Sequence, residues 1–168
     1  MIKVIGMICL VSGFCGLAFD KIRMEKEQIK NLIEIRDFVC YLKGEIDYSH
    51  IPIPDICHEY SDRTEGKIRI FLKNLCKNFE TNEGQSFQNA WECEVGKMEI
   101  KKEEQLLLKK LGKCFGFSNV EMQKTAVANY LQDLEKVLLH YEKKFQGNRK
   151  LILYFGVMSG LLLSIVLL

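Results

Sequence analysis

The chain has 168 residues, with 24 lysines and arginines against 22 aspartates and glutamates and a formal charge of +2. This length suits one domain, and so balanced a charge provides no basic field for the phosphates of a nucleic acid. We therefore expect no nucleic acid partner. The charges are also segregated, because all of them except Lys3 lie between Asp20 and Lys150.

The first apolar segment runs from Val4 to Phe19 without a charge. It is short for a membrane span, but Met1 and Ile2 extend it and Lys3 can reach the interface. We predict a transmembrane anchor over residues 1–19. A cleavable signal peptide is the alternative, since Gly16 and Ala18 resemble a cleavage site.

The last apolar segment, Leu151 to Leu168, also carries no charge. At 1.5 Å per residue it is about 27 Å long, close to the thickness of a bilayer core. We predict a transmembrane helix over residues 151–168. The alternative is a buried core helix, which normally shows a polar side.

Basic residues next to both segments predict the orientation. They are Lys21, Arg23, Lys26, Lys30, Lys143, Lys144, Arg149 and Lys150. Because such residues favour the cytoplasmic side, we expect a cell membrane protein with two spans and a cytoplasmic domain over residues 20–150.

Small residues recur along both predicted spans. On the first they are Gly6, Cys9, Gly13 and Gly16, and on the second Gly156, Gly160 and Ser164. Such stripes let helices approach closely in lipid, so we expect these residues to pack the two spans together. Frequent glycine in membrane helices is the simpler explanation.

The cysteines indicate a reducing compartment. They are Cys9, Cys15, Cys40, Cys57, Cys76, Cys93 and Cys114, an odd number with no C-x-x-C pair. This pattern is typical of free thiols, most of them on apolar helix faces, and agrees with a cytoplasmic middle region.

The middle region has helical periodicity throughout and no alternating strand pattern. A long helix from Asp20 is predicted to end near Pro52 and Pro54, one of which we expect at the first position of the next helix. The clearest later stripe is Ile68, Phe71, Leu72, Leu75, Cys76 and Phe79, which "TNEG" ends. Further stripes begin at Phe87 and Leu107, and "KKEEQ" at Lys101 to Gln105 is interpreted as a solvated helix start.

The segment "GFSNVEM" predicts a helix boundary. Gly116 can end one helix in the left-handed conformation, Ser118 and Glu121 fit a capping box, and Phe117 with Met122 fits a hydrophobic staple. We predict a last helix from Asn119 to about Phe145, before Gly147. The body is therefore expected to be an all-α bundle of about five or six helices.

No pattern indicates catalysis, a cofactor or a metal. Neither phosphate-binding glycine motif is present, and convergence of His50, Cys57 and His58 on a metal is disfavoured because one short stretch does not fix a tetrahedral ligand set. Trp91, followed by Glu92, is interpreted as a core residue, with a partner anchor as the alternative. We expect a protein that is not an enzyme.

Several stretches resemble the stage III sporulation protein AB family of endospore-forming bacteria, over essentially the whole chain. They are "LKGEIDYSHIPIPDI" at Leu42 to Ile56, "AWE" at Ala90 to Glu92, "LGKCFGFSNVEMQ" at Leu111 to Gln123, and the glycine-bearing apolar tail. The motif positions we single out are Glu45, Tyr48, Pro52, Trp91 and Glu92. Ile51 and Ile53 depart from the family pattern, in which Thr and Leu are usual, so a hydroxyl cap worth about 1 kcal/mol is missing.

The resemblance implies a membrane platform in the channel complex that links the mother cell to the forespore, with the central domain on the mother cell side and similar to type II secretion platform proteins. It implies a cytoplasmic ATPase, the stage III sporulation protein AA, and other channel membrane proteins as partners. We expect the ATPase at the turns Asp47 to Asp55 and Thr81 to Gln85, the first of which lies about 40 Å from the membrane along a straight helix. The alternatives are an adaptor of another secretion or pilus-like assembly and a membrane-anchored enzyme whose site assembles on folding.

Overall fold

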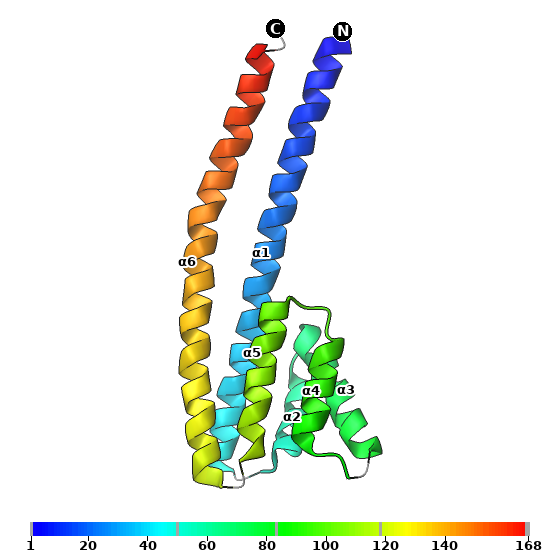
Figure 1. Cartoon of the computed structure of the whole chain (residues 1–168), viewed down its shortest axis with the longest axis vertical. Helices are drawn as coiled ribbons and strands as arrows, with labels where there is room; N and C mark the ends of the chain where they lie inside the picture. The colour runs from blue at the N-terminus through cyan, green and yellow to red at the C-terminus, as the bar shows by residue number, and fades with distance from the viewer. Residues whose placement is uncertain (1, 50, 83, 118, 167–168) are drawn as a thin grey trace. The chain divides into compact units, whose positions relative to one another are not determined.

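The computed structural model describes residues 2–49, 51–82, 84–117 and 119–166, with side chains from 19 to 147 inside those ranges and a few beyond. Its described residues form six α-helices and one 3-10 turn, without a strand (Figure 1). The elements are α1 (Ile2–Tyr48), α2 (Ile53–Arg63), α3 (Gly66–Thr81), α4 (Phe87–Lys97), α5 (Lys102–Lys113), η1 (Cys114–Gly116) and α6 (Val120–Val166). The expected all-α bundle is confirmed.

The chain divides into two compact units, one of residues 1–29 with 139–168 and one of residues 30–138. The first unit holds the N-terminal part of α1 and the C-terminal part of α6. Over the described residues, no helix combines the length and the hydrophobicity that a bilayer crossing requires. Most side chains of residues 4–19 and 151–168 lie outside the described ones, so the two spans stay predictions.

Aromatic side chains fill the core of the 30–138 unit. The Trp91 side chain is fully buried. Its ring meets Phe71 edge-on at 4.8 Å and Phe115 edge-on at 4.9 Å, and its Nε1–H donates to Leu108 O over 2.7 Å. On the same helix as Leu108, a Cβ at Gly112 would lie 2.4 Å from Trp91 Cδ1. Glycine therefore lets α5 approach the indole of α4 closely.

The helical stripes largely follow the predicted ones. On α3, the predicted stripe is buried at Ile68, Phe71, Leu72, Leu75 and Cys76, whereas its last residue, Phe79, is half-buried. On α6, Val127, Tyr130, Leu134 and Leu138 are buried, whereas Met122 is exposed. The Tyr130 hydroxyl donates to Leu107 O over 3.0 Å, which satisfies a polar group that the packing buries.

Two predicted helix boundaries are wrong. The first helical residue of α2 is Ile53, with Pro52 at the N-cap and Pro54 second. Pro52 acts there through its carbonyl, which accepts from the N–H groups of Asp55 and Ile56. In addition, α6 continues past Gly147 to Val166, because one glycine costs a helix only about 1 kcal/mol.

The start of α3 depends on a glycine. Gly66 has a φ of +80°, and a Cβ there would lie 2.6 Å from Glu34 Oε1 of α1. The Glu34 carboxylate is thus next to the first turn of α3, where a negative charge stabilises a helix. The side chain of Glu65, the residue before α3, makes no capping hydrogen bond to this helix.

Candidate functional site

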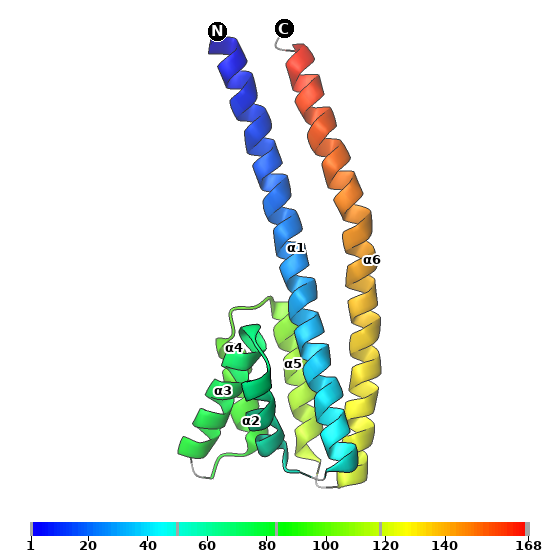
Figure 2. The ribbon, with the colours of Figure 1, turned by 180° about the vertical axis from the view of Figure 1, so that it is seen from behind.

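Three turns lie at the same end of the 30–138 bundle (Figures 1 and 2). They join α1 to α2, α3 to α4, and η1 to α6. We call this surface the turn end and define it as the described residues among 47–55, 81–86 and 117–122. It contains both turns that we expected to bind an ATPase, so segments far apart in the sequence lie at one end of the bundle.

Large apolar side chains are exposed at the turn end. Tyr48, the last residue of α1, is 87% exposed, and Phe117, Val120 and Met122 are also in solvent. Single exposed apolar residues need no explanation, but several on one surface are typical of protein interaction sites. The sequence patterns singled out Tyr48 for its family motif, whereas Phe117 and Met122 were expected to staple a helix.

The first turn is built by the backbone around the family motif. Ser49 N–H donates to Glu45 O over 2.9 Å, which closes the last turn of α1. Glu45 is half-buried and Pro52 is exposed. Pro52 has φ −58° and ψ 141° and supplies no side-chain cap, and this extended conformation redirects the chain into α2.

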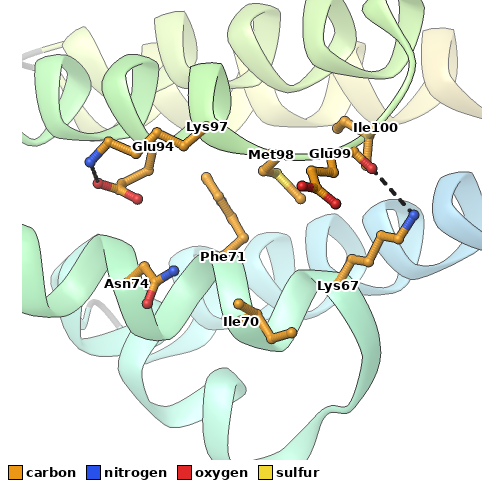
Figure 3. Close-up of a pocket in the computed structure, with 9 residues that line it drawn as sticks. All are labelled: Lys67, Ile70, Phe71, Asn74, Glu94, Lys97, Met98, Glu99 and Ile100. Atoms are coloured by element: carbon orange, nitrogen blue, oxygen red, sulfur yellow. Dashed lines mark hydrogen bonds and ion pairs between the residues drawn. The ribbon is translucent and has the colours of Figure 1, made fainter.

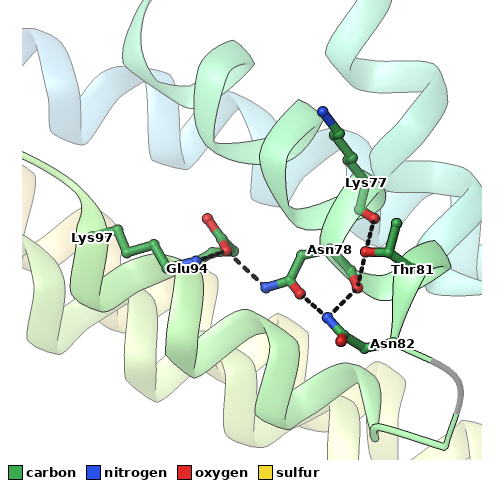
Figure 4. Close-up of polar contacts among 6 residues, drawn as sticks. All are labelled: Lys77, Asn78, Thr81, Asn82, Glu94 and Lys97. Atoms are coloured by element: carbon green, nitrogen blue, oxygen red, sulfur yellow. Dashed lines mark hydrogen bonds and ion pairs between the residues drawn. The ribbon is translucent and has the colours of Figure 1, made fainter.

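Side-chain hydrogen bonds close the end of α3 in the second turn (Figure 4). Thr81 Oγ1 donates to Lys77 O over 2.8 Å, and Asn82 Nδ2 donates to Asn78 O over 3.0 Å. These bonds satisfy carbonyls that the helix leaves without a partner. Asn78 also donates to Glu94 Oε1 over 2.8 Å, so the same residues tie α3 to α4.

The third turn differs from its prediction. Gly116 ends a 3-10 turn and has no positive φ, because the chain leaves through an extended Phe117 instead. The helix starts at Val120, and Asn119 Oδ1 accepts from Glu121 N–H over 2.8 Å. Asn119 therefore caps α6. Ser118, the predicted cap, lies outside the described residues.

The other predicted site residues occupy different environments. Trp91 belongs to the core, as interpreted, and the half-buried Glu92 accepts from Gln88 Nε2 over 3.3 Å. Added Cβ atoms at Gly13 and Gly16 meet no neighbour within 4 Å. Nothing beyond the backbone is described for the remaining stripe residues: Gly6, Cys9, Gly156, Gly160 and Ser164.

The environments of the buried Cys57 and Cys76 do not favour a nucleophile. Burial raises the pKa of the Cys57 thiol well above its usual range and that of Cys76 to about 11, so both thiols are neutral near pH 7. Among described residues, no group of His, Cys, Asp and Glu has a metal-binding arrangement. His50, one of the three weighed as ligands, falls outside them.

The sequence patterns missed a buried carboxylate. Glu104 was assigned to a solvated helix start, but only 1% of the residue is exposed. Its Oε2 accepts from Asn31 Nδ2 of α1 over 3.0 Å, while its Oε1 accepts no hydrogen bond from the described residues. Burial raises the pKa of this carboxyl, whereas the Asn31 hydrogen bond and the nearby Lys101 and Lys67 act in the opposite direction.

This raised pKa predicts a pH dependence of stability. The folded state binds the Glu104 proton more tightly than the unfolded state does. Protonation of Glu104 therefore adds its full contribution to the free energy of unfolding below the ordinary glutamate pKa, and this contribution is lost as pH rises through the pKa of the folded state. Glu104→Gln removes that loss. We expect the free energy of unfolding of the variant, minus that of the native chain, to increase with pH in urea titrations. A difference that is constant or falls with pH contradicts the assignment.

The fold and these surfaces define an all-helical protein with an exposed apolar end. A family model described as "Stage III sporulation protein AB" matches residues 3–168. The chain belongs to this family, which implies a role in sporulation. It is 23% identical over 171 residues to the stage III sporulation protein AB of Bacillus subtilis (strain 168), covering 99% of both chains.

A solved structure of a stage III sporulation protein AB has a similar fold. The TM-score is 0.64 at 20% identity, covering 71% of this chain and 97% of that one. At this identity the likeness concerns the fold alone. The names of these relatives describe sporulation proteins and no enzymatic activity.

Proposed function

We propose that this protein is a non-enzymatic membrane platform of the channel between mother cell and forespore, and that its turn end docks a cytoplasmic ATPase. Membership of a sporulation family supports the cellular process. The charge-free terminal segments flanked by basic residues support anchoring at both ends, with residues 20–150 on the mother cell side.

The exposed apolar side chains at the turn end are the observation that carries the docking proposal. Tyr48, Phe117, Val120 and Met122 come from two helices and a turn of one bundle. Aromatic residues and methionine are enriched in the buried centres of protein interfaces. A rigid helical bundle presents them with little entropy to lose on binding, which suits a part that passes a mechanical or assembly signal.

Binding of the companion stage III sporulation protein AA tests this function. With the full chain in neutral detergent, we expect the triple variant Tyr48→Ser, Phe117→Ser, Met122→Ser to weaken ATPase binding at least about tenfold, since interface anchors cost 1.4 kcal/mol or more when removed. Leu106→Ser is the control, because Leu106 is 70% exposed on α5 outside the turn end, and it should leave the Kd unchanged. The Kd is measured by biolayer interferometry.

Three outcomes oppose the proposal. If the native chain does not bind the ATPase, the platform function fails and an adaptor role in another assembly becomes the better account. If the native chain binds and the triple variant binds equally well, the function survives but the turn end is not the docking surface. Protease digestion of residues 20–150 from outside intact cells would contradict the membrane orientation.

A further inference from the structure

A groove of about 360 Å³ lies between α3, the end of α4 and the following linker (Figure 3). Four apolar side chains line it, Ile70, Phe71, Met98 and Ile100. Ile70 is largely exposed, although it stands on a helix whose other apolar residues are buried or half-buried. The size and the apolar lining with a few polar groups are typical of ligand sites. The groove shares no residue with the turn end.

A smaller cavity of about 10 Å³ adjoins this groove. Lys67, Met98 and Ile100 line both spaces and so form the wall between them. Glu104 lines the inner cavity, and its Oε1 is the oxygen without a hydrogen bond from the described residues. Leaving such an oxygen buried and unpaired destabilises the folded state, so a donor that reaches it would be bound favourably. An unbranched methionine in the wall can change rotamer easily.

The charges around the groove favour a cationic ligand. Both lysines that line it already have acceptors, since Lys67 Nζ donates to Glu99 O over 3.3 Å and Lys97 Nζ lies 2.5 Å from Glu94 Oε1 (Figure 3). Within the described part of the chain, the exposed Glu99 carboxylate forms no ion pair. The Glu99 carboxylate at the mouth therefore has no ion-pair partner, and Glu104 behind the wall, although Lys101 and Lys67 lie near enough to act on its pKa, keeps one oxygen that accepts no hydrogen bond from the described residues.

We propose that this groove binds a segment of a partner protein that presents one arginine or lysine between apolar side chains. The apolar neighbours pack on Ile70 and Phe71. The cationic head passes Glu99 at the mouth and reaches Glu104 Oε1 after Met98 moves aside. A charge-assisted hydrogen bond to a buried carboxylate is about twice as strong as a neutral one, so a single basic side chain provides most of the specificity.

Two peptides that differ only in the charge of one side chain test whether binding requires that charge. The probes are acetyl-Ala-Leu-Arg-Leu-Ala-amide and the same peptide with neutral, nearly isosteric citrulline in place of arginine. They are titrated into the full chain in neutral detergent near pH 8, with the methyl signals of Ile70, Met98 and Ile100 followed by NMR. We expect saturable binding of the arginine peptide, at least about tenfold tighter than that of the citrulline peptide, which corresponds to 1.4 kcal/mol.

Variants locate the site. Glu104→Gln and Glu99→Gln should each reduce the affinity for the arginine peptide severalfold and leave the citrulline peptide unchanged, whereas Ile70→Ser should weaken both peptides. Glu135→Gln, at an exposed position on α6, is the control and should change neither. Ile70 and Glu99 are exposed, so their variants remain informative if Glu104→Gln folds poorly.

Three results would overturn the proposal. The first is equal affinity for the two peptides, or no binding of either. The second is that Glu99→Gln reduces the affinity for the arginine peptide whereas Glu104→Gln leaves it unchanged. The third is binding of n-butylguanidinium at these methyl groups without binding of the arginine peptide, because the groove then accepts a small organic cation and not a protein segment.

Discussion

Replacing Trp91 by alanine lowers the free energy of unfolding by about 3–5 kcal/mol, the usual cost of truncating a fully buried tryptophan. The indole is 0% exposed, contacts Phe71 and Phe115 edge-on, and donates to Leu108 O. Alanine leaves a cavity and removes the indole hydrogen bond to Leu108 O. Urea unfolding of the full chain in neutral detergent, followed by circular dichroism, measures this loss.

Two matched variants test whether the loss comes from the Trp91 side chain itself or whether any substitution destabilises the chain. Trp91→Phe keeps an aromatic ring and loses the hydrogen bond, so its loss should be clearly smaller than that of the alanine variant. Leu106→Ala changes a 70% exposed side chain and should stay within about 0.5 kcal/mol of the native chain. A Trp91→Ala loss below 1 kcal/mol would show that the indole does not hold the helices together.

The periodicity of α3 was sufficient to predict its buried face. Ile68, Phe71, Leu72, Leu75 and Cys76 recur at helical spacing and are all buried, because an apolar stripe has no other stable location in water. The same reasoning predicted a core role for Trp91. The buried face of α3 and the core position of Trp91 each depend on the pattern within a single helix, so the local sequence is sufficient to predict them.

Contacts made by neighbouring helices could not be predicted in this way. Glu104 stands in a run of charged residues, and it is buried because residues of α1 and α3 pack around it, with Asn31 against its carboxylate. The residues around Gly112 in the sequence do not indicate that it packs closely on another helix, yet it faces the Trp91 ring. The turn end likewise depends on three turns that the fold brings to the same end of the bundle. Such features depend on tertiary packing, which local patterns do not encode.

Two glycine-to-alanine substitutions should change stability in opposite directions. At Gly66, the φ of +80° costs a residue with a Cβ about 1–2 kcal/mol, and that Cβ would also lie 2.6 Å from Glu34 Oε1. We expect Gly66→Ala to destabilise the chain by about 1–3 kcal/mol in total. Gly44 lies within α1 with no neighbour inside 4 Å of an added Cβ, so Gly44→Ala should stabilise by up to about 1 kcal/mol.

A double-mutant cycle separates the two causes at Gly66. In a Glu34→Ala background the carboxylate is absent, so Gly66→Ala should retain the backbone cost and lose the steric one, with a coupling of about 0.5 kcal/mol or more between the two sites. Additive effects would mean that the Glu34 side chain simply moves aside. If Gly66→Ala were as stabilising as Gly44→Ala, the first turn of α3 could not require a left-handed residue, and its alignment with the Glu34 carboxylate would need another explanation.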